Sequence, residues 1–172
     1  MNNSYSHITH ESISPFINID SKILILGSLP SVKSRESGFF YGHKMNRFFP
    51  MLAKMFKEEV PITVEEKKEL LMKHNIALYD VIYECDIIGS SDSSIKNVVP
   101  IDIKVILKDY PNINTIILNG NLASSLFKKY LLSDVSENIK IFYLPSTSPA
   151  NAKMKLDDLV DAYKKAFINK TQ

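Results

Sequence analysis

The sequence has little cysteine and no long hydrophobic run, and both absences exclude whole classes of protein. Its single cysteine, Cys85, cannot form an intrachain disulfide, and an iron–sulfur cluster needs about four thiolates. No pair of cysteines or histidines has the spacing of a zinc site. The apolar runs are far shorter than the roughly 18 residues of a membrane span, and the polar N-terminal residues do not form a signal peptide pattern. We therefore expect a soluble, cytoplasmic protein without a metal or another cofactor.

The sequence also lacks a strong net charge, internal repeats and a recognisable linker. Its formal net charge is +2, which permits a nucleic-acid partner but does not indicate one by itself. A chain of 172 residues that is 45% hydrophobic and 23% charged is long enough to bury one sizeable core. We expect a monomer with one domain over residues 1–172, in which residues 1–14 form a loosely ordered tail.

Short apolar runs alternate with amphipathic segments along the rest of the chain. The pattern predicts strands at residues 23–26, 76–81, 114–120 and 139–145, and helices at 46–56, 63–74, 102–111, 122–131 and 155–167. Strands separated by helices of this length are typical of parallel pairing with right-handed crossovers. The sequence therefore predicts an α/β fold, a three-layer α/β/α sandwich with a central, mostly parallel four-stranded sheet.

Three of the predicted strands end in loops that are rich in small polar residues, glycine or proline. These loops are GSLPS at Gly27, NGN at Asn119 and LPSTSPAN at Leu144. The carboxyl ends of parallel strands meet at one edge of a sheet, so the three loops are expected to line one cleft. Such loops allow backbone amides and hydroxyl groups to approach phosphate oxygens closely.

The GSLPS loop, its continuation GFFYGHKMNRFF and the LPSTSPAN loop resemble the two motifs of the uracil-DNA glycosylase superfamily. They are most similar to its hypoxanthine-DNA (deoxyinosine) glycosylase branch, and the spacing to the HxxNRF segment is similar to that of the mismatch-specific uracil glycosylases. The resemblance extends from about Lys22 to Asn151 and includes LYDVI at Leu78 and SDSSI at Ser91. It implies the same fold that the periodicity predicts.

The resemblance implies an enzyme of base excision repair that acts on DNA containing deaminated bases. Such an enzyme flips a nucleotide from the duplex and hydrolyses the bond between the base and the sugar. The expected activity is a monofunctional DNA glycosylase for hypoxanthine. A uracil-DNA glycosylase and a non-catalytic nucleic-acid-binding relative remain as alternatives.

Two leucines depart from the superfamily pattern. Members that remove uracil usually carry Asp or Asn, which orients the attacking water, where this chain has Leu29, and several relatives have His or Asn in place of Leu144. The resemblance to the hypoxanthine branch implies that Asn46 takes over, because its amide can hold a water and stabilise charge. The alternative for Asn46 is a helix N-cap. His43 is a further catalytic candidate, with a structural role as its alternative.

The resemblance also implies which residues hold the flipped base. Tyr41 would stack on the base and Phe40, with Phe39, would form the wall behind it. The alternative is that these aromatic residues anchor the loop in the core, and it has equal support for Phe39 and Phe40 but less for Tyr41. Asn119 offers a donor and an acceptor that match the edge of hypoxanthine or uracil, or else it makes a strand-to-helix turn. The remaining expected base-binding residues are Gly27, Ser28 and Leu29.

DNA contacts are expected from the same two loops. The candidates are Pro30, Ser31, Ser146, Thr147, Ser148 and Pro149. The alternative for the second loop is that it caps the last helix. Lys153 and Lys155 could bind phosphate or remain solvated, and Arg47 could bind a phosphate or a carboxylate.

Other function classes have weaker support in the sequence. A serine hydrolase could use Ser28 or Ser146 with His43 as base, but the GxSxG elbow and an acid partner are missing. A nucleotide-binding module is disfavoured because neither GxGxxG nor a P-loop follows the first strand.

Overall fold

A parallel four-stranded sheet lies at the centre of the protein. The computed structural model describes residues 3–168, and the strand order is β3-β2-β6-β7 with every neighbouring pair parallel. This arrangement confirms the predicted fold class. The strands of the sheet are β2 (Ile23–Gly27), β3 (Ile76–Asp80), β6 (Thr115–Asn119) and β7 (Lys140–Leu144).

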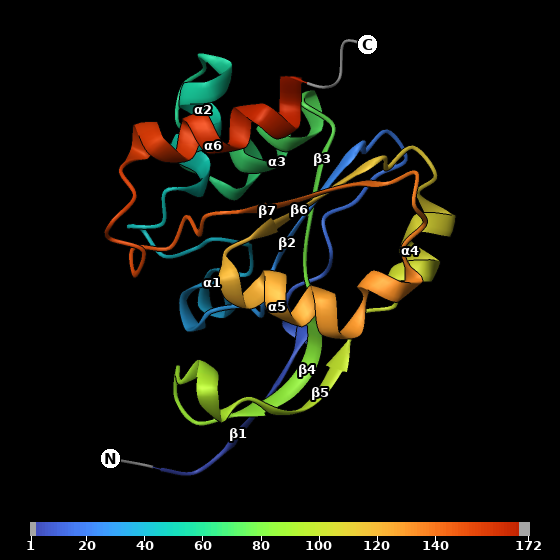
Figure 1. Cartoon of the computed structure of the whole chain (residues 1–172). Coiled ribbons are helices and arrows are strands. Elements are labelled where there is room, and N and C mark those ends of the chain that lie inside the picture. Colours follow the sequence, from blue (N-terminus) through green and yellow to red (C-terminus); the bar gives the residue numbers. More distant parts are fainter. Residues whose placement is uncertain (1–2, 169–172) are drawn as a thin grey trace.

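Helices cover both faces of this sheet. In Figure 1, α2, α3 and α6 lie on one side of the sheet and α4 and α5 on the other. Every residue of β2, β3 and β6 is buried, as expected for parallel strands covered on both faces. The helices are α1 (Val32–Ser37), α2 (Phe48–Phe56), α3 (Val64–Lys73), α4 (Ile103–Asp109), α5 (Asn121–Tyr130) and α6 (Leu156–Ile168).

A side-chain cap sets the start of α3, whereas the N-cap residue of α2, Arg47, makes no capping bond with its side chain. At α3, the hydroxyl of Thr63 accepts from the Glu66 amide at 3.1 Å and the Glu66 carboxylate accepts from the Thr63 amide at 3.1 Å. This reciprocal pair is a capping box, and it starts the helix predicted at residues 63–74. Helix α2 begins at Phe48, two residues later than predicted, although Asn46 Oδ1 still accepts a hydrogen bond from the Phe48 amide at 3.0 Å.

A second sheet was not predicted. It is antiparallel, with the order β1-β4-β5, and its strands are β1 (Ser6–Thr9), β4 (Ile82–Ile87) and β5 (Lys96–Pro100). Residues 89–100, for which the sequence predicts no strand or helix, contain β5 and a short 3-10 helix, η2 (Asp92–Ser94).

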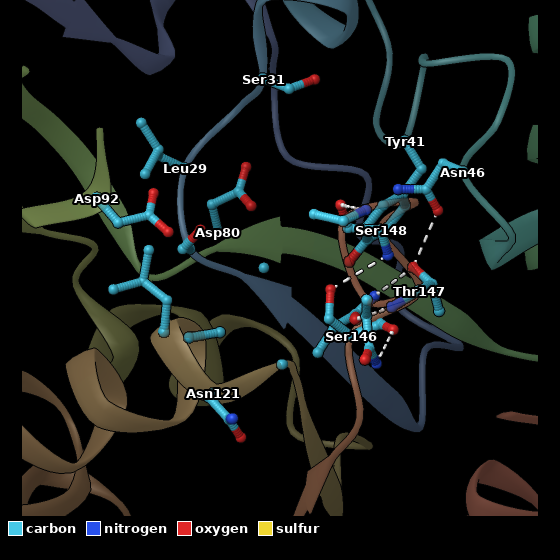
Figure 2. Close-up of a pocket in the computed structure, with 18 of the residues that line it drawn as sticks. Leu29, Ser31, Tyr41, Asn46, Asp80, Asp92, Asn121, Ser146, Thr147 and Ser148 are labelled. Carbon is cyan, nitrogen blue, oxygen red and sulfur yellow. Dashed lines mark hydrogen bonds between the residues drawn. The ribbon is translucent and has the colours of Figure 1, made fainter. Parts of the chain in front are cut away.

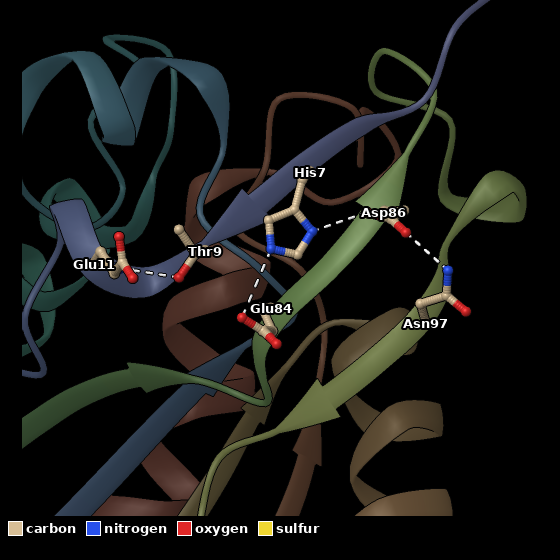
Figure 3. A network of polar contacts seen from close by, with 6 residues as sticks. All are labelled: His7, Thr9, Glu11, Glu84, Asp86 and Asn97. Atoms are coloured by element: carbon tan, nitrogen blue, oxygen red, sulfur yellow. Dashed lines mark hydrogen bonds and ion pairs between the residues drawn. The ribbon is translucent and has the colours of Figure 1, made fainter.

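The expected loosely ordered tail over residues 1–14 is wrong for the residues that the structure describes; Met1 and Asn2 lie outside them. Strand β1 pairs with β4, and η1 (His10–Ser12) follows it. Ile8, His10 and Ile13 are buried. Figure 3 shows His7 of β1 between Glu84 and Asp86 of β4, where its Nδ1 lies 2.9 Å from Asp86 Oδ1. The bond to Asp86 raises the pKa of His7.

The first loop is also more ordered than predicted, because it contains helix α1. The Ser31 hydroxyl accepts from the Ser34 amide at 3.1 Å, and Gly38 ends the helix with a φ of 74°, a conformation that glycine adopts without a steric penalty.

Within residues 3–168, no helix has the length and apolar character needed to cross a bilayer. No group of three or more His, Cys, Asp or Glu side chains in the same range is placed to hold a metal ion.

Candidate active site

The carboxyl ends of the parallel strands open into a cavity of about 1260 Å³. Figure 2 shows its two sides: Leu29 and Asp80 lie on one, and Tyr41, Asn46 and Thr147 lie on the other. This is the edge at which open α/β sheets bind ligands. Fourteen of the predicted site residues line the cavity: Gly27, Ser28, Leu29, Pro30, Ser31, Phe40, Tyr41, His43, Asn46, Asn119, Ser146, Thr147, Ser148 and Pro149.

Three polar side chains form a hydrogen-bonded chain beneath the cavity, the Asn46–Thr147–Asn119 chain. Asn119 Nδ2 donates to Thr147 Oγ1 at 3.1 Å, and Thr147 Oγ1 donates to Asn46 Oδ1 at 2.9 Å. Asn119 Oδ1 accepts from the Thr147 amide at 3.0 Å. The backbone amides fix the direction, because an N–H group must meet an oxygen: the Phe48 amide identifies Oδ1 of Asn46, and the Thr147 amide identifies Oδ1 of Asn119.

As a result, Asn46 is oriented by partners on one side only. Its Oδ1 accepts two hydrogen bonds, whereas no described residue hydrogen-bonds to its Nδ2. Asn46 is half-buried and lines the cavity. The side chain can therefore cap the first turn of α2 and still offer N–H donors to a ligand.

Arg47 connects the two motif loops. Its Nη2 donates to the carbonyls of Ser148 at 2.8 Å and Asn151 at 2.9 Å, and its Nη1 donates to the carbonyl of Met154. Its backbone amide donates to the Thr147 carbonyl at 3.0 Å. The guanidinium therefore binds backbone carbonyls and fixes the second loop against the start of α2.

Tyr41 occupies an unusual backbone conformation at the cavity. Its φ is 54°, in the left-handed region that few non-glycine residues adopt. One face of its ring stacks on Phe48, with centroids 4.1 Å apart. Its hydroxyl is buried without a hydrogen-bond partner among the described residues. Burial, and then the nearby Asp80 carboxylate, raise the pKa of Tyr41.

The other aromatic candidates belong to the core. Phe39 is 5% exposed and Phe40 3% exposed, and their rings meet edge to face. Phe40 also lines the cavity, whereas Phe39 does not. Phe40 therefore fits the expected wall and Phe39 is an anchor of the loop.

Burial argues against two of the expected DNA contacts, Pro30 and Thr147. Thr147 is 0% exposed, so its side chain lies below the surface and joins Asn46 to Asn119. Ser31 is exposed but its hydroxyl caps α1. Ser146, Ser148 and Pro149 reach the surface of the second loop.

His43 lies on the exposed part of the first loop. Its Nδ1 accepts from the Met45 amide at 3.0 Å, so the neutral ring carries its proton on Nε2. The ring lines the cavity from this position.

Comparison with known proteins assigns the chain to a family. The family model of the uracil DNA glycosylase superfamily matches residues 14–172. The chain belongs to the uracil DNA glycosylase superfamily.

The relatives include two proteins named hypoxanthine DNA glycosylase. One, from Methanosarcina barkeri, is 35% identical over 62% of this chain and 68% of the relative. The other, from Methanosarcina acetivorans, is 33% identical over 78% of this chain and 83% of the relative. A solution NMR structure from Methanosarcina acetivorans, described as a candidate uracil DNA glycosylase, superposes with a TM-score of 0.75 at 25% identity and covers 90% of this chain and 96% of that one. The resemblance found in the two motifs is confirmed.

The sequence did not predict the polar pair that Asp80 and His10 form at the cavity. Asp80 ends β3 and pairs in register with Gly27; its Oδ2 lies 2.9 Å from His10 Nε2. His10 Nδ1 lies 2.8 Å from the Ile13 carbonyl. The LYDVI segment contains Asp80, but nothing local in the sequence indicates that a histidine 70 residues earlier packs against it.

Proposed function

We propose that the protein hydrolyses the N-glycosidic bond of deoxyinosine in DNA and releases hypoxanthine, as a monofunctional glycosylase of base excision repair. The observation that carries the proposal is the oriented amide of Asn46, whose N–H donors are free at a cavity beside Tyr41. The two relatives named hypoxanthine DNA glycosylase support the choice of base.

Asn119 retains the groups needed to bind the base edge. Thr147 occupies one N–H and one lone pair of its amide, so one donor and one acceptor remain. Hypoxanthine presents an N–H beside a carbonyl, which matches this pair. Tyr41 lines the cavity, and the face of its ring opposite Phe48 is where the base would stack.

The charges around the cavity favour a DNA backbone. Four cationic residues line it, and the carboxylates that line it are Asp80, which is buried, and Asp92. The cationic residues are Lys33, Arg35, Lys128 and Lys153. An excess of positive charge at the rim attracts phosphates even though the net charge of the chain is only +2.

The test uses duplex oligonucleotides with a single deoxyinosine, uracil or xanthine, in chelator and without an added cofactor. Abasic sites are then cleaved with hot alkali. Cleavage at deoxyinosine is the expected result. No cleavage of any substrate at high enzyme excess would leave only a DNA-binding role, and a lysine adduct trapped by borohydride would contradict direct hydrolysis by water.

Two substitutions of Asn46 separate its catalytic role from its role as a cap. Asn46→Asp keeps an oxygen for the Phe48 amide and the Thr147 hydroxyl but removes the free N–H donors. We expect it to retain the melting temperature while single-turnover cleavage falls by about 100-fold or more. Asn46→Ala should lose activity and stability together. An active Asn46→Asp variant would show that the amide donors are not used.

Uracil is the second candidate base, because the family model and the similar solved structure both carry the name of uracil DNA glycosylase. The same panel of oligonucleotides decides between the two bases.

A further inference from the structure

Hydrolysis needs an atom that accepts a proton from the attacking water, and Asn46 does not supply it. Both hydrogen bonds to Asn46 Oδ1 come from the protein, and the amide is not basic. Leu29, in the GSLPS loop, has no polar group in its side chain. Another group that lines the cavity must therefore accept the proton.

Asp80 is the buried carboxylate of the cavity. It is 5% exposed and lies at the carboxyl end of β3, directly beside Gly27 of β2. Its Oδ1 lies 2.4 Å from the point that a Cβ would occupy at Gly27, so this oxygen sits over the start of the first motif loop. No described residue donates a hydrogen bond to Oδ1, whereas Oδ2 meets His10. Asp92, the other carboxylate that lines the cavity, is exposed.

The Tyr41 hydroxyl makes no hydrogen bond of normal geometry with a described residue, although the Asn119 side chain lies near enough to lower its pKa. The Tyr41 hydroxyl lies 3.6 Å from the same Cβ point at Gly27, and it is buried without a partner among the described residues. A buried hydroxyl without a hydrogen bond is costly, by roughly 1–3 kcal/mol. A water bound between this hydroxyl and Asp80 Oδ1 would satisfy both groups.

His10 holds the Asp80 carboxylate in place through the contact between its Nε2 and Asp80 Oδ2. The Ile13 carbonyl can only accept, so His10 Nδ1 carries a proton. The contact between Nε2 and Asp80 Oδ2 then contains a second proton, which either group can carry. Burial lowers the pKa of His10, but the bond to Asp80 and the charge of Asp80 outweigh it, so the net shift is upward. The position of His10 therefore favours its protonated form beside Asp80.

We infer that Asp80, positioned by His10, is a catalytic residue that binds the attacking water through Oδ1 and accepts its proton. The inference rests on the proposed glycosylase activity. In this step the bond between the sugar C1′ and the base nitrogen breaks, and its electron pair leaves with the base. The water oxygen bonds to C1′, one water proton passes to Asp80 Oδ1, and the departing base takes up a proton from solvent. Asp80 then returns its proton to solvent.

The first experiment compares Asp80→Asn with Asp109→Asn under single-turnover conditions on deoxyinosine duplex. Asp109 is the control because it is an exposed aspartate of α4 that does not line the cavity. Asp80→Asn keeps the shape and should lower the rate by about 100-fold or more, the effect of removing a positioned base. Asp109→Asn should retain the wild-type rate. A wild-type enzyme that does not cleave deoxyinosine would overturn the proposed function, whereas active wild type with equally active Asp80→Asn would overturn this inference alone.

The second experiment distinguishes a catalytic Asp80 from a structural one. DNA binding is measured with two abasic analogues, a neutral tetrahydrofuran and a positively charged pyrrolidine, which imitates the sugar cation. Asp80→Asn should weaken binding of the charged analogue more than that of the neutral one. The ratio of the two dissociation constants, charged to neutral, should rise by about tenfold. A general loss of structure would weaken both equally and contradict the inference. His10→Gln, which removes the positioning residue, should shift the same ratio by a smaller factor.

Discussion

The hydroxyl of Thr147 hydrogen-bonds both to Asn46 of the first motif and to Asn119 of β6, and its removal tests this connection. Thr147→Val replaces the hydroxyl with a methyl group of similar size. The substitution deletes the bond to Asn46 Oδ1 at 2.9 Å and leaves Asn119 Nδ2 without its acceptor at 3.1 Å. The bond from the Thr147 amide to Asn119 Oδ1 is retained.

The expected magnitude follows from burial. Thr147 is 0% exposed and Asn119 9% exposed, so the unpaired N–H of Asn119 has little access to water. A buried donor without a partner costs about 1–3 kcal/mol. For a chain of 172 residues, each kcal/mol corresponds to roughly 2–4 °C in melting temperature. We therefore expect Thr147→Val to melt several degrees below wild type.

Urea unfolding of a double-mutant cycle is the measurement. The cycle pairs Thr147→Val with Asn46→Ala, because the two residues share a hydrogen bond. The combined loss should be smaller than the sum of the separate losses by roughly 0.5–1.5 kcal/mol. Thr147→Ser, which keeps the hydroxyl and loses a methyl group, should retain most of the single-turnover rate. Additive losses of stability, or equal inactivation by Thr147→Ser and Thr147→Val, would contradict the hydrogen bonds assigned to the Asn46–Thr147–Asn119 chain.

Two further predictions concern a loop contact and the buried histidine. Gly120 has a φ of 102°, and a Cβ there would lie 2.9 Å from Ser146 Cβ. Gly120→Ala should therefore lower the melting temperature. Gly89→Ala, whose added Cβ meets nothing within 4 Å, should lower it less. The folded pKa of His10 is raised above the ordinary value of 6.5, so its contribution to stability is complete below that pH and is lost as the pH rises through the folded pKa. Urea unfolding should show the free-energy gap between wild type and His10→Gln narrowing from pH 6 to pH 9, and a constant gap would contradict a charged pair.

The parallel sheet could be predicted because each of its strands is a short apolar run with a clear end. The segments at 23–26, 76–81, 114–120 and 139–145 all became strands of one sheet. The loops that end these strands came together for the same topological reason. Local pattern was therefore sufficient for the frame of the site.

The second sheet could not be predicted because its signals are not local. Strand β4 follows β3 after the single residue Val81, without a turn residue that marks a new strand. Strand β1, which pairs with β4, is mostly exposed and polar. The two strands lie more than 70 residues apart in the sequence. Burial of Ile8, His10 and Ile13 depends on that pairing. The Asp80–His10 pair was missed for the same reason, since β1 is what brings His10 to the end of β3.

The polar groups of the site share one feature that compensates for the two leucines. Leu29 and Leu144 remove side-chain polarity from the positions where superfamily relatives carry it, yet each polar cluster ends on backbone atoms. The Asn46–Thr147–Asn119 chain ends on the amides of Phe48 and Thr147, and the Asp80–His10 pair ends on the carbonyl of Ile13. Backbone atoms in helices and paired strands are already ordered by the fold, so orienting a side chain against them adds little entropy cost beyond that of the side chain itself. Each cluster therefore keeps its orientation before a ligand binds, which electrostatic stabilisation of a transition state requires.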